Sequence, residues 1–185
     1  TFLTPSEALK NGVVMVFQEN SLVPNMTVSQ NIYLGAEDFF NSLAKLNIKA
    51  SRFLQSLNFN VDPNLLVSQL GAAQKQMVEI ARAVHHNAKV IIFDEPTATL
   101  TPEEKHHFFG LMQRLKKEGV SIVFISHALE EALEHSDRIT VLRDGELIET
   151  DKAKKFSRER IVKAMIGRDL TDSAYASKKA ITKNN

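Results

Sequence analysis

Cysteine and tryptophan are both absent from the 185-residue sequence. Without cysteine the chain forms no disulfide, has no thiolate nucleophile and cannot bind zinc through sulfur, which is typical of proteins in a reducing compartment. An excess of charge of one sign is also lacking, because 23 basic and 22 acidic residues leave a formal net charge of +1. Such a chain has no bulk field that attracts nucleic acid or anionic lipid, and we expect no nucleic-acid partner.

Long hydrophobic runs are missing as well. No apolar stretch approaches the roughly 20 residues of a membrane-spanning helix, and the amino-terminal sequence TFLTPSEALK lacks the basic and apolar segments of a secretory signal. Apolar residues nevertheless make up 43% of the chain, enough for the core of one ordinary domain with a small attached lobe. We therefore expect a soluble chain that reaches any membrane by docking to it.

Three helix starts can be read from capping boxes, in which a threonine precedes Glu or Gln by three residues. The pairs are Thr4 with Glu7, Thr27 with Gln30, and Thr101 with Glu104. Proline follows two of these threonines, at the first helical position, where it is favoured. The boxes predict a short helix that ends near Gly12, a helix from about Val28, and a helix over 102–118.

Three short apolar runs, GVVMVF at 12–17, VIIF at 90–93 and SIVFI at 121–125, predict buried strands. A mostly helical stretch to about Phe59 and a helix from about Gln74 separate the first two runs. Strands that alternate with helices predict an α/β fold, with a parallel sheet covered by helices on both faces.

The carboxyl-terminal part of the sequence has a different pattern from the part that precedes it. The runs RITVLR and ELIE flank the turn Asp144-Gly145 and predict a hairpin that adds an antiparallel edge to the sheet. A helix follows from about Arg158 to Ile166, closed by Gly167. The remainder, 168–185, is polar and aperiodic, which predicts a linker or disordered tail.

Polar side chains follow each of the three predicted parallel strands: Gln18, the pair Asp94 and Glu95, and His127. Ligands of open α/β sheets bind at the carboxyl ends of the strands, where helix N-termini and loop amides converge. Asp94 suits Mg²⁺, Glu95 suits an attacking water, Gln18 suits either, and His127 suits a terminal phosphate. Together these residues predict a phosphoryl-transfer site.

Each of these residues also has a plain structural explanation. Gln18 alone is compatible with a surface turn, and His127 alone with a structural histidine. Asp94 and Glu95, followed by proline, are compatible with a cap on the next turn. The combination of all four at three strand ends is what favours the catalytic interpretation.

Around these residues the chain resembles the ATP-binding subunits of ABC transporters, over nearly its whole length. VIIFDEPTATL is similar to the family's Walker B strand, catalytic glutamate and D-loop, MVFQEN to its Q-loop, and FISHALEEA to its switch-histidine segment. QLGAAQKQMVEIARAV stands where the family has its LSGGQ signature motif. EALKNGVVMVFQENSLVPNMTVSQNIYLG, DEPTATLT and VLRDGELI with AMIGRDL resemble the first ATPase half of tandem proteins that energise bacterial ribose- and galactose-type importers.

The resemblance implies a P-loop NTPase-like fold that binds ATP and magnesium. It implies that Asp94 and Gln18 hold Mg²⁺, that Glu95 is the general base and that His127 contacts the γ-phosphate. Gln18 would also couple the site to the membrane partner. The signature residues would face a nucleotide bound by a second ATPase domain, in the same chain or in a dimer; they are Gly71, Ala72, Ala73 and Gln74.

The same resemblance divides the chain. It implies a partial ATPase core at 1–24 and 76–167, a helical subdomain with the signature motif at 25–75, and the tail at 168–185. The helical subdomain would contact the transmembrane permease subunits of an importer, with a sugar-binding protein as an indirect partner. The protein would then act at the cytoplasmic face of the bacterial cell membrane, as a peripheral subunit.

Two departures from the family pattern stand out. The chain has no GxxxxGK[ST] sequence, the Walker A loop that holds the β- and γ-phosphates. In the family this loop precedes the Q-loop, so we expect a truncated domain. Each lost charge-assisted hydrogen bond costs about 1.5–3 kcal/mol, so we expect the 185 residues alone not to hydrolyse ATP. In addition, Gly71 stands at the position of the signature serine, so the helix amides remain without the hydroxyl.

The sequence is also compatible with two other functions. One is a catalytically incompetent regulatory or binding module of the same fold, which pairs with a competent ATPase domain. The other is a soluble ABC-type ATPase of DNA repair or translation. The near-neutral charge argues against the second, because it provides no phosphate-binding stripe.

Overall fold

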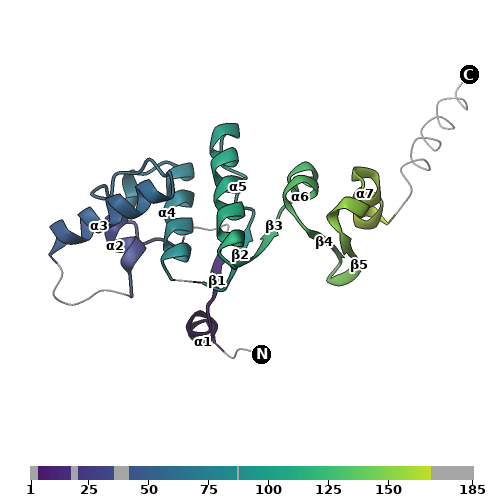
Figure 1. Cartoon of the computed structure of the whole chain (residues 1–185), viewed down its shortest axis with the longest axis horizontal. Coiled ribbons are helices and arrows are strands. Elements are labelled where there is room, and N and C mark those ends of the chain that lie inside the picture. Colours follow the sequence, from purple (N-terminus) through teal and green to yellow (C-terminus); the bar gives the residue numbers. More distant parts are fainter. Residues whose placement is uncertain (1–3, 18–20, 36–41, 87, 168–185) are drawn as a thin grey trace, which may run out of the picture. The chain divides into compact units, whose positions relative to one another are not determined.

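A computed structural model describes residues 4–17, 21–35, 42–86 and 88–167. The chain forms two compact units, Thr1–Ile125 and Ser126–Asn185 (Figure 1). Each unit has its own hydrophobic core. No helix in the described ranges is long and apolar enough to span a membrane.

A three-stranded parallel sheet forms the centre of the first unit (Figure 1). Its strands are β1 (Val13–Val16), β2 (Val90–Asp94) and β3 (Ser121–Ile125), in the order β1-β2-β3. The register aligns Val14, Ile91 and Ile122 across the three strands. The three short apolar runs are thus confirmed as parallel strands.

The described residues of this unit form the helices α1 (Pro5–Lys10), α2 (Val28–Tyr33), α3 (Leu43–Ser56), α4 (Ala72–His85) and α5 (Pro102–Lys117), with a short 3₁₀ turn at Val67–Gln69. Three of these helices, α1, α2 and α5, begin where the capping threonines predict. The hydroxyls of Thr4, Thr27 and Thr101 accept the amide three residues on, at 3.2, 3.3 and 3.3 Å. Helix α4 begins two residues before its predicted start.

One face of the sheet packs against α5. Ile91 and Phe93 of β2 are 1% and 0% exposed. The ring of Phe93 meets Phe108 edge-on at a centroid distance of 5.2 Å, and Phe109 meets Phe124 of β3 at 6.2 Å. Fully burying such a side chain contributes about 1.5–3 kcal/mol. The buried residues of α5 are Phe108, Phe109, Leu111, Met112 and Leu115.

The opposite face of the sheet is open. Met15, Ile92 and Val123 lie side by side on it, because side chains alternate along each strand. Met15 is 37% exposed and Val123 is 50% exposed. The prediction that helices cover both faces is therefore wrong for the described residues. An apolar run indicates that a strand can be buried. Actual burial also requires another helix or strand that packs against that face.

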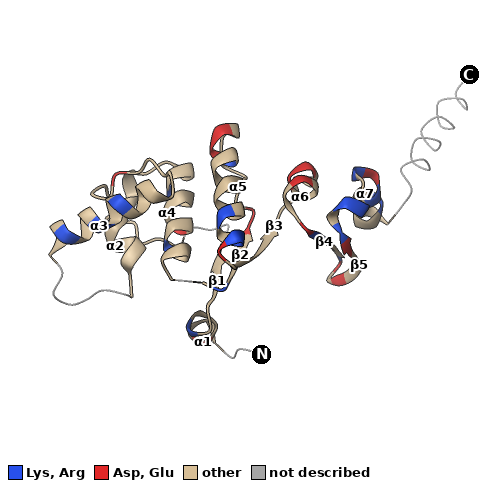
Figure 2. Cartoon of the chain, viewed as in Figure 1, with Lys and Arg blue, Asp and Glu red and all other residues tan. Residues whose placement is uncertain are grey.

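The charged residues of α5 are arranged favourably for its helix dipole. Figure 2 shows acidic residues at its first turn and basic residues at its last. They are Glu103 and Glu104, then Arg114, Lys116 and Lys117. This arrangement is favourable because a helix carries partial positive charge at its N-terminus and partial negative charge at its C-terminus.

The second unit contains α6 (Leu129–His135), β4 (Arg138–Arg143), β5 (Glu146–Lys152), a 3₁₀ turn at Ala153–Lys155 and α7 (Arg158–Ile166). The turn at Asp144 and Gly145 has φ values of 53° and 80°, as the Asp-Gly pair predicts. Strands β4 and β5 form a two-stranded sheet of their own, so the prediction that they extend the parallel sheet is wrong. A hairpin turn fixes only the pairing of its own two strands.

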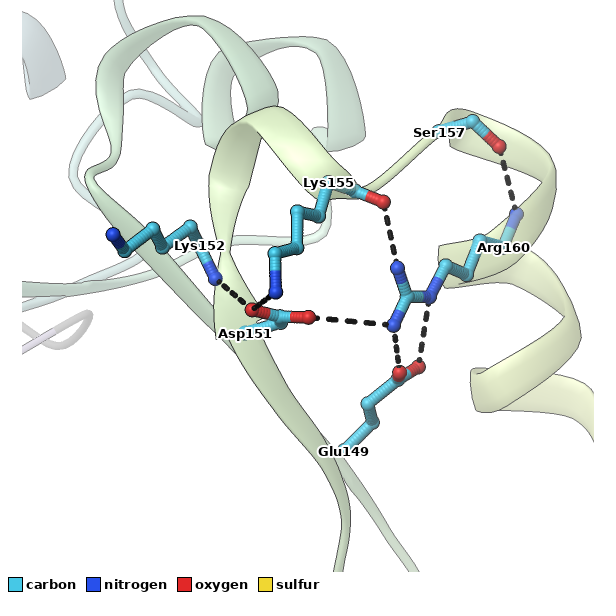
Figure 3. A network of polar contacts seen from close by, with 6 residues as sticks. All are labelled: Glu149, Asp151, Lys152, Lys155, Ser157 and Arg160. Carbon is cyan, nitrogen blue, oxygen red and sulfur yellow. Dashed lines mark hydrogen bonds and ion pairs between the residues drawn. The ribbon is translucent and has the colours of Figure 1, made fainter.

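Polar contacts close this second unit around Arg160 of α7 (Figure 3). Its guanidinium binds both carboxylate oxygens of Glu149 on β5 and donates to the carbonyl of Lys155 at 2.6 Å. The Lys152 amide and then the Lys155 ammonium hold the pKa of Asp151 below its ordinary value. Helix α7 ends at Gly167 with a φ of 75°, as predicted. The tail predicted at 168–185 lies outside the described residues.

Candidate functional site

Asp94 lies at the carboxyl end of the central strand. It is the last residue of β2, and it pairs in register with Ile125, the last residue of β3. Alternation along β2 places its side chain on the same face as Ile92, the open face of the sheet. The Asp94 side chain is partly exposed, so a solvent-borne ligand can reach its carboxylate.

Glu95 has an unusual backbone. Its φ of 50° lies in the left-handed region, which among the described non-glycine residues it shares only with Asn58 and Asp144. Asn and Asp tolerate this region better than other residues, whereas for Glu we expect a cost on the order of 1–2 kcal/mol. The Glu95 amide donates to the carbonyl of Ile125 at 3.0 Å, which fixes this conformation at the end of β3. Strain of this kind concentrates at functional positions.

The turn after Glu95 is tight and buried. Thr97 is 3% exposed, and its carbonyl accepts the amide of Leu100 at 3.2 Å. Thr101 then caps α5 through a reciprocal pair of hydrogen bonds with Glu104. The two adjacent carboxylates are thus held between a buried strand and a firmly capped helix.

His127 belongs to the second unit. It is exposed, and the Ser126 hydroxyl accepts the Ala128 amide at 3.0 Å, which forms a tight turn around it just before α6. Its position relative to Asp94 and Glu95 stays a prediction. Gln18 lies outside the described residues.

The carboxylates at this site fit one kind of magnesium binding. Within the described ranges, no three His, Cys, Asp or Glu side chains gather into a metal site. Magnesium is commonly held by one or two carboxylates together with phosphate oxygens and water. The accessible carboxylate of Asp94 suits that mode, in which a bound nucleotide supplies the phosphate oxygens.

The predicted signature residues surround the N-terminus of α4. Gly71 is the N-cap, and its amide donates to the side chain of Gln74 at 3.3 Å. Gly71 and Ala72 are exposed, while Ala73 and Gln74 are partly buried. A Cβ atom placed on Gly71 would meet nothing within 4 Å. The position therefore has room for the serine that the family pattern expects.

One polar cluster on α4 was missed by the sequence reasoning. Glu79 of α4 is 2% exposed, and its carboxylate binds Ser21, 58 residues away. Arg82 binds the same serine. A glutamate inside the apolar sequence MVEIA is the signal that could have drawn attention to this helix face.

Comparison with known proteins decides the family. The sequence model of the family described as "ABC transporter" matches residues 3–98, more than half of the 185 residues. This chain belongs to the ABC transporter family. The family resemblance read from the sequence motifs is therefore confirmed.

Curated relatives of the chain are named as ATP-binding proteins of sugar import. The galactose/methyl galactoside import ATP-binding protein MglA of Clostridium perfringens (strain ATCC 13124) is 43% identical over 174 residues. The ribose import ATP-binding protein RbsA of Chelativorans sp. (strain BNC1) is 43% identical over 170 residues. Each match covers 92% of this chain and 34% of the relative. The chain thus spans about a third of the length of these relatives.

Solved ABC cassettes share the fold. The ADP conformation of MJ1267, an ATP-binding cassette of an ABC transporter, matches with a TM-score of 0.69 and 27% identity, over 89% of this chain and 72% of that one. The dimeric cassette MJ0796 with bound ADP and Pi matches with a TM-score of 0.71 and 27% identity, over 83% and 69%. The predicted fold class, a P-loop NTPase-like α/β fold, is confirmed.

Proposed function

We propose that this chain is part of the ATP-hydrolysing subunit that energises carbohydrate import through an ABC transporter. The observation that carries the proposal is the pair of carboxylates at the end of β2. Asp94 continues the buried strand, and Glu95 is held in a left-handed conformation by the end of β3. Family membership and relatives named as galactose and ribose import proteins support the same function.

The site residues have separate roles in this proposal. Asp94 binds magnesium, with Gln18 as a further ligand, and the bound ion neutralises charge on the phosphates. Glu95 accepts a proton from the attacking water, and its fixed backbone restricts where its carboxylate can reach. His127 donates a hydrogen bond to the γ-phosphate, where negative charge is concentrated.

The signature residues serve a different nucleotide. In the proposal the amides at the start of α4, from Ala72 onward, face the phosphates of ATP bound to a second ATPase domain, in the same chain or in a dimer. The helix dipole supports this, because partial positive charge gathers at a helix N-terminus. The dimeric state reported for the MJ0796 cassette is consistent with such an arrangement.

The proposed partners place the protein at a membrane. Residues 25–75 contact the transmembrane permease subunits, and a sugar-binding protein is reached indirectly through them. The protein is then peripheral, at the cytoplasmic face of the bacterial cell membrane. The names of the importer relatives support these assignments.

The 185 residues alone are proposed not to hydrolyse ATP. They contain no GxxxxGK[ST] sequence, so the phosphates lack a cradle of backbone amides and a lysine. Loss of three charge-assisted hydrogen bonds weakens binding by roughly a thousandfold or more, at about 1.5–3 kcal/mol each.

Phosphate release from Mg-ATP tests the proposal in two chains. The 185-residue chain is expected to release none above background. A longer chain, extended upstream of Thr1 by a segment that contains a GxxxxGK[ST] sequence, is expected to hydrolyse ATP. Glu95→Gln in that longer chain should lower kcat by about 10²–10⁴-fold, the usual contribution of a general base. The exposed Glu103→Gln serves as the matched control.

Two results would contradict the proposal. Turnover by the 185-residue chain would show that it needs no Walker A loop. Retained turnover in the Glu95→Gln version of the longer chain would remove Glu95 as the base. A longer chain that binds ATP without hydrolysing it would instead favour the regulatory module, which the glycine at position 71 also supports.

A further inference from the structure

The sequence contains one asparagine that is followed by glycine, at Asn11 and Gly12. In such a pair the backbone nitrogen of the glycine can approach the side-chain amide carbon of the asparagine, because glycine has no Cβ atom that hinders the approach. Asn11 is exposed, and it is the C-cap of α1. Solvent and the neighbouring backbone can therefore both reach this side chain.

In the folded helix, carbonyls of α1 hold both reacting groups. The side-chain nitrogen of Asn11 donates to the carbonyl of Glu7 at 2.8 Å. The Gly12 amide donates to the carbonyl of Leu9 at 2.9 Å, so its nitrogen is not available for attack. The pair can therefore react only when the last turn of α1 opens.

Opening of α1 requires little free energy. The helix has six residues, none of which is buried, and Leu9 is 41% exposed. Helices this short are marginal in water unless tertiary packing supports them. Segments with few buried contacts open locally far more often than the whole chain unfolds. The Asn11-Gly12 pair is therefore released repeatedly while the core stays folded.

We propose that Asn11 is a site of spontaneous deamidation, and that the opening of α1 controls its rate. The Gly12 nitrogen loses its proton to water and attacks the side-chain carbonyl carbon of Asn11. The new C–N bond closes a succinimide ring, and the side-chain nitrogen leaves with a proton from water as ammonia. A second water opens the ring at either carbonyl, so the net change is the hydrolysis of an amide to a carboxylate. The proposed function takes no part in this reaction.

The reaction has two products, and one of them alters the first strand. The first product has an aspartate at position 11, and the second has an isoaspartate, which adds an extra main-chain atom immediately before Gly12. The carbonyl of Gly12 accepts the amides of Lys89 and Val90, at 2.7 and 3.0 Å, and the pairing of β1 with β2 begins at Val13. Both products place a negative charge at the end of α1, where the helix dipole disfavours it. We expect the isoaspartate also to weaken the start of β1.

Peptide mass spectrometry tests the site in the 185-residue chain after storage at neutral pH. Cleavage after Lys10 and Lys45 gives a single peptide that contains both Asn11 and Asn25. Asn25 is also exposed but is followed by Met26, so it is the internal control. We expect the mass change of an amide converted to an acid at Asn11, in two chromatographically distinct isomers. Equal modification at both asparagines, or none at Asn11, would overturn the proposal.

Thr4→Ala tests the dependence on α1. The Thr4 hydroxyl accepts the Glu7 amide at 3.2 Å, so the substitution removes the N-cap of the helix and no core contact. Deamidation at Asn11 should become about fivefold faster, which corresponds to about 1 kcal/mol of lost helix stability. Ser6→Ala, at an exposed position of α1, is the matched control and should leave the rate within about twofold. Equal rates in Thr4→Ala and the parent chain would overturn the control by α1.

Urea unfolding of the stored chain tests the consequence for β1. Ion exchange isolates the acidic fraction, and the two peptide isomers report its isoaspartate content. Asn11→Asp is the matched control, because it carries the same charge on an ordinary main chain. We expect a lower urea midpoint for the isoaspartate-containing chain than for Asn11→Asp, and equal midpoints would refute the effect on β1. None of these measurements involves ATP hydrolysis, so they decide the deamidation site independently of the proposed function.

Discussion

The two faces of the parallel sheet are built from similar residues but lie in different environments. On one face Ile91 is 1% exposed, and on the other Ile125 is 49% exposed. The first face packs against the aromatic rings of α5, and the second carries Asp94, whose carboxylate a ligand can reach. One face therefore stabilises the strands, and the other exposes the Asp94 carboxylate to solvent.

The two environments predict how well each position tolerates a shorter side chain. A covered side chain that is shortened leaves a cavity, because the surrounding core collapses only partly. An exposed side chain loses little when it is shortened, because water already surrounds much of it. The same substitution on the two faces therefore separates stabilising positions from tolerant ones.

The largest difference is expected between two isoleucines. Ile91→Ala should lower the free energy of unfolding by about 2–5 kcal/mol, as buried isoleucine truncations do. Ile125→Ala on the neighbouring strand should cost less than about 1 kcal/mol, because half of its side chain is already in water. Urea unfolding of both variants measures the pair. Equal losses would show that the second face is covered in solution.

Two glycines extend the comparison to the backbone. Gly12 has a φ of 82°, and a Cβ atom there would lie 3.2 Å from the Lys89 backbone nitrogen. Gly12→Ala should therefore cost about 1–2 kcal/mol, the penalty of a left-handed alanine. Gly110 is exposed within α5 with nothing near its Cβ position, so Gly110→Ala should stabilise by about 0.5–1 kcal/mol. Thermal unfolding that shifts both variants in the same direction would contradict this contrast.

Much of the fold follows from short-range signals. Thr27 and Thr101 fix helix starts through hydrogen bonds three residues away, and Asp144 with Gly145 fixes a hairpin turn. Each of these signals involves only a few neighbouring residues, so it can be recognised in the sequence. The open face and the separate hairpin depend on what packs against a strand, and a strand's own sequence does not specify that partner.

The candidate site likewise has some features that the sequence predicts and others that it does not. The end of an apolar strand predicts where Asp94 and Glu95 stand, and the family pattern predicts their roles. The left-handed backbone of Glu95 depends on the carbonyl of Ile125, 30 positions along the chain, so no local pattern shows it. The attachment of Ser21 to Glu79 spans 58 positions and was missed for the same reason.

A half-buried histidine gives a smaller, pH-dependent effect. His85 packs edge-on against Tyr33 at a centroid distance of 4.5 Å. Burial, and then the charges of His86 and Lys49, lower the pKa of His85 from its ordinary 6.5. The folded chain then binds fewer protons than the unfolded chain just below pH 6.5, so stability should fall as the pH drops through that range.

Removing His85 should reduce this dependence. In His85→Leu, the loss of stability between pH 7.5 and pH 5.5 is expected to shrink but not to vanish, because the pKa of His86 is also lowered by burial and then by the charge of Arg82. His106→Leu, at an exposed position of α5, is the control. Unfolding midpoints across the pH range measure both variants, and an unchanged slope in His85→Leu would contradict the prediction.

The smallest effect is expected at Gly71, on the exposed start of α4. Gly71→Ser should stabilise the chain by a few tenths of a kcal/mol, because a serine hydroxyl at the N-cap accepts a first-turn amide and glycine is only slightly worse there. Gly71→Ala, which fills the same open space without a hydroxyl, should instead destabilise by about 0.5–1 kcal/mol. Paired thermal unfolding measures this difference in sign. If serine and alanine destabilise equally, a Cβ atom is not accommodated at position 71, and the missing signature serine reflects space rather than hydrogen bonding.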